Sequence, residues 1–197
     1  MRPSLPALLL TASLAGAVPS APVLAADDGQ NVGEHLLLTP PAGWQPVQMQ
    51  RSEKMTITRL YPPGENEKAW TEIVTVQIYP TNNQSARQFA ESIVQYSRDA
   101  CDAIGPSPVT ERAVNGYPLA AVSVTCSRGK SSGMGGFVMA TVIRGKDAIY
   151  AVQRQWRGPA FGHNQSPAFP PDMLRRWSVF FPTISLCDTR DTRHPCP

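Results

Sequence analysis

Apolar and polar residues alternate in several short segments of the chain, which is the pattern of half-buried β-strands. The clearest segment is Glu72–Tyr79, whose apolar residues recur at every second position: Val74, Val76 and Ile78. Shorter strand-like segments precede it at Val47–Arg51 and Thr56–Tyr61, and Glu34–Thr39 is a short apolar segment before them. The first half of the chain is therefore expected to supply several strands.

One segment, Ser85–Ala100, has apolar residues at three- and four-residue spacing instead, which predicts a long helix. Its apolar stripe consists of Ala86, Phe89, Ile93, Tyr96 and Ala100. Ser85 and Gln88 fit a capping box, in which the two side chains satisfy backbone donors at the start of the helix. A short second helix is expected around Asp172–Val179.

Two hairpins are expected after the long helix. The dipeptide Asn115-Gly116 suits the positive φ angles of a two-residue turn, and it joins Val109–Val114 to Tyr117–Cys126. A second turn signal joins Phe137–Arg144 to Ala148–Trp156. The segment Phe137–Arg144 carries apolar residues on both faces, which predicts a central strand that is covered on both sides.

This order of elements predicts an α+β fold. Strands precede and follow a single long helix, and most of them are joined as hairpins, which favours an antiparallel sheet. We expect a single sheet of about six to seven strands, covered by one long helix and one or more short ones.

The N-terminal segment has the pattern of a secretory signal peptide. Arg2 gives it a positive charge, Leu5–Val18 is apolar and uncharged, and small or apolar residues lead up to Ala25. A membrane anchor would need about 20 uninterrupted apolar residues, and Pro19 and Pro22 interrupt this stretch. We therefore expect export to the periplasm and cleavage after about Ala25.

The composition is that of a globular domain. Apolar residues make up 42% of the chain and charged residues 17%, a balance that disordered chains do not have. The formal charge of +3, which loss of Arg2 lowers to +2, is too small for a nucleic-acid partner. No later segment is long and apolar enough to span a membrane. Residues 1–25 are thus interpreted as the signal peptide and residues 26–197 as one soluble domain.

Four cysteines remain after cleavage: Cys101, Cys126, Cys187 and Cys196. An even number of cysteines in an exported chain favours two disulfides. Of the three pairings, Cys101–Cys126 with Cys187–Cys196 is preferred, because the second bond closes a short loop and ties the C-terminal tail to the domain. A metal site that combines these thiolates with His194 is the alternative, but the spacing lacks a Cys-x-x-Cys pair.

The sequence shows no catalytic constellation. The three histidines, His35, His163 and His194, lack the spacing of metal ligands, and no serine lies in a Gly-x-Ser-x-Gly motif. The glycine-rich segment Ser131–Gly136 lacks a phosphate-binding lysine and precedes a strand, so it is interpreted as a hairpin connection. We expect no enzymatic activity, no metal and no cofactor.

Acidic residues gather around one tryptophan. Glu65, Glu67 and Glu72 surround Trp70, a composition that could bind a sugar or a cation. Glycoside hydrolysis needs two carboxyl groups that face each other across a cleft, and closeness in sequence does not provide that. The simpler interpretation is a tryptophan that caps the core beside solvated acids.

Basic residues gather near the second hairpin. They are Arg144, Lys146, Arg154 and Arg157, and they indicate either a weak anion-binding surface or, more simply, a solvated sheet face. The residues taken as candidates for binding are Trp70, Glu72, Arg154 and Trp156.

Several motifs resemble those of uncharacterised exported proteins of Gram-negative bacteria. The motifs are Tyr61–Glu65, Trp70–Gln77, Asn115–Pro118, Cys187–Arg190 and His194–Pro197. The order of elements is similar to the PsbP and DcrB type of fold, an antiparallel sheet covered by helices. The resemblance implies a periplasmic location, disulfides and this fold, and it leaves the activity open.

Together these features predict a non-catalytic periplasmic binding or accessory protein. Its partner would be a periplasmic protein, a peptide or a lipid. Two alternatives remain, a small hydrolase of an envelope polymer and an accessory subunit of a secretion or conjugation apparatus.

Overall fold

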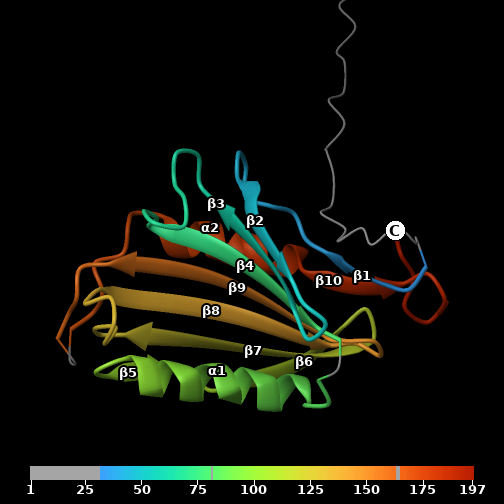
Figure 1. Ribbon diagram of the computed structural model, residues 1–197. Helices are drawn as coiled ribbons and strands as arrows, with labels where there is room; N and C mark the ends of the chain where they lie inside the picture. The colour runs from blue at the N-terminus through green and yellow to red at the C-terminus, as the bar shows by residue number, and fades with distance from the viewer. Residues whose placement is uncertain (1–31, 81, 163–164) are drawn as a thin grey trace, which may run out of the picture.

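A computed structural model describes residues 32–80, 82–162 and 165–197. The expected signal peptide, residues 1–25, and His163 lie outside the described residues. The described part of the chain is built around one large twisted sheet with a helix on each face (Figure 1). No helix among the described residues has the length and apolar character needed to cross a membrane.

The elements follow the chain in a simple order. The strands before the long helix are β1 (Glu34–Leu37), β2 (Gln45–Arg51), β3 (Thr56–Tyr61) and β4 (Glu72–Tyr79). The helix α1 (Ala86–Ala100) is followed by β5 (Ile104–Pro106), β6 (Thr110–Val114), β7 (Tyr117–Cys126), β8 (Gly135–Arg144) and β9 (Ile149–Gly158). The chain ends with α2 (Met173–Phe180), the 3-10 helix η1 (Phe181–Thr183) and β10 (Ser185–Asp188).

Eight strands form the large sheet in the order β2-β3-β4-β9-β8-β7-β5, with β6 also paired to β7. Every pairing is antiparallel. The expected α+β fold is confirmed, but the structure has more strands than expected and divides them between two sheets. The strand β1 pairs with β10 rather than with the large sheet. The two strands are far apart in the sequence, so no turn motif could predict their pairing.

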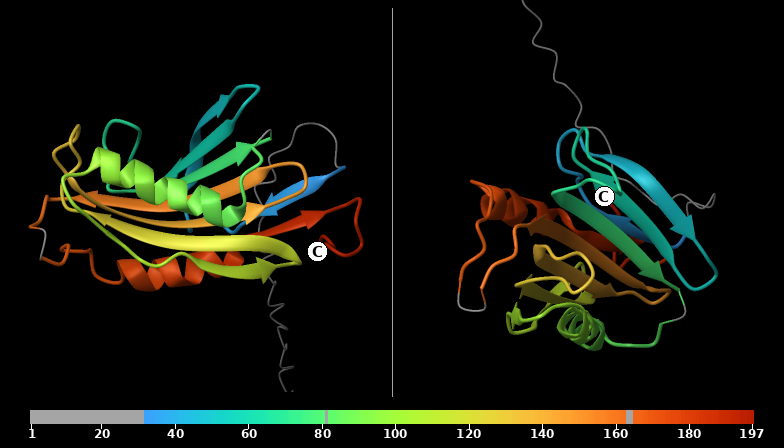
Figure 2. Two further views of the ribbon diagram at one scale, coloured as in Figure 1. Left: turned by 90° about the horizontal axis from the view of Figure 1, so that it is seen from below. Right: turned by 60° about the vertical axis from the view of Figure 1, so that its left-hand side comes forward.

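The helix α1 packs on one face of the sheet, over β7, β8 and the short β5. Figure 2 shows α1 and α2 on opposite sides of the sheet. Small side chains under α1 let the helix approach closely: Ala120, Ala140 and Ala151 from the strands and Ala86 and Ala90 from the helix. The predicted capping box is present, since Gln88 N donates to Ser85 Oγ and Ser85 N donates to the Gln88 side chain.

Two residues of the expected α1 stripe, Tyr96 and Ala100, do not join this core. Tyr96 is 75% exposed, whereas Phe89 and Ile93 are buried. Tyr96 lies at the edge of the stripe that faces away from β7 and towards the uncovered strands. A residue of an apolar stripe is therefore buried only where the helix has a strand packed against it.

The opposite face of the sheet carries the larger core. Aromatic and aliphatic residues from α2, η1 and the β1–β10 pair pack there against the sheet, including Trp177, Phe180, Leu186 and Leu36. The hairpin predicted at Asn115-Gly116 joins β6 and β7, and both turn residues have positive φ, 45° and 81°. The strand β8 lies between β7 and β9 with both faces covered, as expected.

Two disulfides with the preferred pairing are present. Cys101–Cys126 links the end of α1 to the end of β7, and Cys187–Cys196 closes the tail onto β10. The described residues contain no free cysteine. Disulfides of this kind are typical of extracytoplasmic proteins.

Candidate functional site

Two of the candidate binding residues, Glu72 and Arg154, are in contact on one buried face of the sheet. They lie 82 positions apart in the sequence, and the antiparallel pairing of β4 with β9 places them on the same face. Arg154 Nη2 donates to Glu72 Oε2 over 2.9 Å, and their side chains are only 3% and 9% exposed. The pair is therefore a buried ion pair on the α2 face.

Glu72 accepts hydrogen bonds from two further donors. Trp177 Nε1 donates to the same oxygen, Oε2, and Arg176 Nη2 donates to Oε1, each over 2.9 Å. Both donors come from α2, which begins directly after the loop at Pro170 and Pro171. One carboxylate thus joins two strands to a helix and balances two guanidinium groups, which leaves one excess positive charge.

Aromatic rings surround the guanidinium of Arg154. Its central carbon lies 5.0 Å from the ring centroid of Trp44, 5.4 Å from that of Trp177 and 5.5 Å from that of Phe180, all within the range of cation–π attraction. Burial lowers the pKa of Arg154, and Glu72 acts against this shift. The buried Nε of Arg154 has no hydrogen-bond partner among the described residues, which is uncommon for a charged group in a protein interior.

A cavity of about 640 Å³ opens beside this cluster, and we call it the Arg154 cavity. Its apolar wall includes Pro40, Pro41, Trp44, Val179 and Phe180. Its charged residues are Glu65, Glu72, Arg154, Arg175 and Arg176. The lining therefore combines an apolar wall with three guanidinium groups and two carboxylates.

The other two candidate residues, Trp70 and Trp156, do not line the Arg154 cavity. Trp156 belongs to the core of the α2 face, 4% exposed, with its ring edge-on to Phe169. Trp70 lines a groove on the opposite face of the sheet, and Arg157 stacks on its ring at 4.3 Å. The structure brings together Glu72 and Arg154, places Trp156 directly opposite Glu72 in the pairing of β4 with β9, and leaves Trp70 apart from the ion pair.

The interpretation of the four basic residues as a solvated face is wrong for Arg154, which is 2% exposed. The other three lie apart from it and have their own partners. Arg144 donates to the carbonyl of Asn82, Lys146 pairs with Asp191, and Arg157 donates to the carbonyl of Trp70. Because side chains alternate along β9, Arg154 points to the buried α2 face. The number of basic residues in a segment does not show which face each side chain is on.

The three glutamates near Trp70 line two different cavities. Glu65 and Glu72 line the Arg154 cavity, whereas Glu67 lines the groove on the opposite face. Glu72 is buried, so the interpretation of solvated acids is wrong at this position. Glu65 accepts hydrogen bonds from Thr71 N and Thr71 Oγ1 over 2.6 Å and 2.5 Å, which fixes the loop that leads into β4.

The two described histidines, His35 and His194, lie among residues that hold the β1–β10 pair and the C-terminal tail. The ring of His194 stacks on Tyr117 with centroids 4.0 Å apart, and its Nδ1 lies 2.7 Å from the carbonyl of Asn115. His35 lies in β1 opposite Cys187. Among the described residues no three potential metal-ligating side chains form a group.

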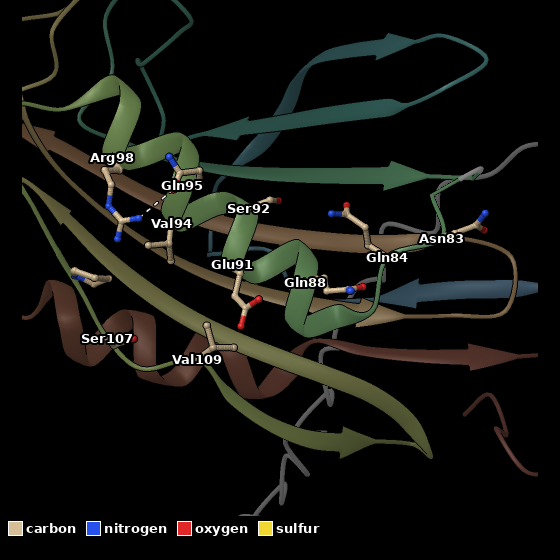
Figure 3. Close-up of a pocket in the computed structure, with 11 residues that line it drawn as sticks. Asn83, Gln84, Gln88, Glu91, Ser92, Val94, Gln95, Arg98, Ser107 and Val109 are labelled. Carbon is tan, nitrogen blue, oxygen red and sulfur yellow. Dashed lines mark hydrogen bonds between the residues drawn. The ribbon is translucent and has the colours of Figure 1, made fainter.

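A broader hollow of about 960 Å³ lies along the outer side of α1 (Figure 3). Its lining is mainly exposed and polar, and Arg98 donates to Gln95 within it over 3.0 Å. No buried charged side chain borders this hollow. It is a surface depression, and the Arg154 cavity is the stronger candidate site.

Sequence reasoning missed three residues of the site: Trp44, Arg176 and Trp177. Each lies more than twenty positions from both Glu72 and Arg154, and none forms a motif with them. A weak signal was present in α2, where Arg175 and Arg176 precede Trp177 on a short amphipathic helix. Only the packing of α2 on the sheet shows that two of these three side chains turn towards Glu72.

Comparison with known proteins gives the fold. No protein-family model matches the chain, and no curated protein matches it in sequence. The Ran-binding protein Mog1p of Saccharomyces cerevisiae is similar in structure, with a TM-score of 0.51 and 10% sequence identity over 79% of this chain and 92% of that chain. LpqN of Mycobacterium tuberculosis, a protein involved in cell envelope biogenesis, has a TM-score of 0.47 and 10% identity over 81% of this chain and 87% of that one. The chain thus has the α+β fold of the Mog1p and PsbP type, with its large antiparallel sheet and two helices.

Proposed function

We propose that this protein is a non-catalytic binding protein of the periplasm, and that the Arg154 cavity holds a small apolar molecule with an anionic group. The observation that carries the proposal is the excess positive charge of the cluster. Arg154 and Arg176 share the single carboxylate of Glu72, and Arg154 is buried among aromatic rings. Glu72 is the counter-charge of the buried Arg154, so the excess charge falls at Arg176, which is 46% exposed and lines the cavity, and an anionic ligand there would balance it.

The shape of the cavity supports the same class of ligand. Its volume of about 640 Å³ lies within the range of small-molecule sites, which are mostly apolar with few polar groups. Val179 is 69% exposed and extends the apolar wall to the surface. A hydrocarbon chain could lie along this wall with its acidic end at Arg176, which is 46% exposed and so accessible.

The hydrolase alternative has less support. Glu72 already accepts hydrogen bonds from three donors, and Glu65 is held by backbone and side-chain donors of its own loop. A general acid or base needs to exchange its proton with the substrate, and both carboxylates are engaged in structural contacts.

Calorimetric titration with decanoate and with decanol tests the proposal. We expect decanoate to bind about tenfold tighter than decanol, because a hydrogen bond to a charged group is worth about 1.5 to 3 kcal/mol. Arg176→Met keeps the apolar stem and removes the excess charge, so it should abolish the preference for the acid. Arg87→Met is the matched control, since Arg87 lies on α1 at the other face and pairs with Glu91 and Glu111.

The proposal fails if neither compound binds, or if decanol binds as tightly as decanoate. It also fails if Arg87→Met and Arg176→Met change the preference equally. The periplasmic location is tested separately by the mass of the protein in an osmotic-shock fraction. A chain that begins at residue 26 is expected, and an uncleaved chain confined to the cytoplasm would contradict the location.

A further inference from the structure

The face of the sheet that carries α1 is only partly covered. The helix packs mainly on β7, β8 and β5, and its Phe89 reaches Tyr79 at the end of β4, so β3 and most of β4 have little of the helix above them. A groove of about 560 Å³ lies between the edge of α1 and these strands. It is separated from the Arg154 cavity by the thickness of the sheet.

Three glutamine side chains form a ladder along the floor of this groove. Gln153 Nε2 donates to Gln77 Oε1 over 2.8 Å, and Gln155 Nε2 donates to Gln153 Oε1 over 3.3 Å. Each amide has two N–H donors and a carbonyl oxygen with two lone pairs, so the three side chains have more hydrogen-bonding groups than these two bonds use. The floor therefore presents neutral groups that both donate and accept hydrogen bonds.

Aromatic rings border the ladder. Trp70 lies at one end, Tyr79 lies on the same strand as Gln77, and Tyr96 projects from α1 with 75% of its surface exposed. Arg157 stacks on Trp70 and donates to its backbone carbonyl over 2.5 Å, which holds the loop in place. Tyrosine and tryptophan offer an apolar ring surface together with a polar end.

The charge of the groove is balanced. Its ionic lining residues are Arg59 and Glu67, which carry opposite charges. The backbone groups of β4 and β9 pair with each other across the floor, so a ligand can be recognised only by side chains. An anionic polymer would find no excess positive charge here, and an extended peptide would find no free strand edge.

We propose that this groove binds a neutral oligosaccharide. Each hydroxyl of a sugar can both donate and accept a hydrogen bond, which matches the donors and acceptors of the amide ladder, and the C–H face of a sugar ring is apolar and flat enough to lie on the exposed ring of Tyr96. The site is separate from the Arg154 cavity, and it requires no chemistry at a carboxylate. A molecule with both sites would be able to hold an amphipathic compound on one face and a glycan on the other.

Calorimetric titration with chitotetraose and maltotetraose tests this site. We expect at least one of these neutral tetrasaccharides to bind the unaltered protein with a Kd in the micromolar to millimolar range. Tyr96→Ala should weaken binding about tenfold or more, and Gln153→Leu should do the same by interrupting the ladder. Gln95→Ala is the matched control, because Gln95 is the neighbouring helix residue and lines the outer hollow instead (Figure 3). It should leave the Kd within about twofold.

Three results would overturn the proposal. The first is that neither tetrasaccharide binds. The second is that Tyr96→Ala and Gln153→Leu, verified as folded by circular dichroism, behave like Gln95→Ala. The third is that tetragalacturonate or tetraalanine binds this groove instead of the neutral sugars. Decanoate binding should be unchanged in Tyr96→Ala, so failure of this site and failure of the Arg154 cavity are distinguishable.

Discussion

The two faces of the large sheet differ in how far their polar side chains are buried, and β9 contributes polar side chains to both faces. Its odd-numbered residues Gln153 and Gln155 face the α1 side, where they form an open neutral ladder. Its even-numbered residue Arg154 faces the α2 side, where helix, loop and strand enclose it. Successive side chains on one strand thus belong to two different environments.

The difference shows what each polar group needs. An amide at the edge of a groove can exchange its partners with water, so the α1 face needs little beyond close packing of small residues. A buried guanidinium needs a charged partner in the correct position, so the α2 face depends on Glu72, Trp177 and the position of α2. Substitution of a buried charged group on the α2 face should accordingly cost more than substitution of an exposed charged group on the α1 face.

The largest effect is expected for Glu72→Gln. The substitution keeps the size of the side chain but leaves Arg154 buried without a counter-charge, which should cost about 3 to 5 kcal/mol of the free energy of unfolding. Urea denaturation measures the loss. The control is Glu91→Gln on α1, whose pair with Arg87 is about half exposed and screened by solvent, so the free energy of unfolding should hardly change. A loss below about 1 kcal/mol for Glu72→Gln would contradict the comparison.

The two disulfides should differ moderately in their contribution. Cys101–Cys126 closes a loop with a sequence separation of 25, and Cys187–Cys196 one with a separation of 9. Loop entropy predicts losses of about 3.5 and about 2.6 kcal/mol when each pair is replaced by serines. Thermal unfolding of the two double variants should show the larger loss for the first pair. The reverse order would mean that the tail contributes more to the α2 face than its loop length indicates.

A smaller effect is expected where α1 lies on alanines. Ala90 is fully buried, so Ala90→Leu should push the helix away from the sheet and cost about 1 to 3 kcal/mol. Val179→Leu on α2, at a side chain that is 69% exposed, is the matched enlargement and should stay within about 0.5 kcal/mol. If urea denaturation gives the same loss of unfolding free energy for the two variants, the core under α1 is not closely packed.

The smallest effect is expected for the loss of stability at acidic pH. Hydrogen bonds from Arg190 lower the pKa of Asp188, and hydrogen bonds from Arg193 and Lys146 lower that of Asp191. A lowered pKa in the folded state stabilises the protein at pH values above the unfolded pKa of about 4. This contribution should decline as the pH falls below about 4, towards the lower folded values. Asp188→Asn and Arg190→Met should each flatten the decline of the melting temperature between pH 4 and pH 2, and an unchanged slope in both would contradict it.

Local patterns predicted the elements of this fold well, because each depends on neighbouring residues. The alternation of Val74, Val76 and Ile78, the capping box of Ser85 and the turn at Asn115-Gly116 all lie within a few positions. The pairing of β4 with β9 and of β1 with β10 depends on packing between distant segments. The candidate site depends on the pairing of β4 with β9, so composition could mark Glu72 and Arg154 as candidates but could not predict their contact.

The pairing of β1 with β10 has a consequence for a chain that emerges N-terminus first. Gly33 and Thr189, which are 156 positions apart, exchange hydrogen bonds beside this pair. The strand β1 must therefore wait, unpaired and with Leu36 exposed, until nearly the whole chain is out. Such long-range closure slows folding and leaves an edge open to aggregation. Among the described strands, β1 is thus the one whose partner strand is synthesised last.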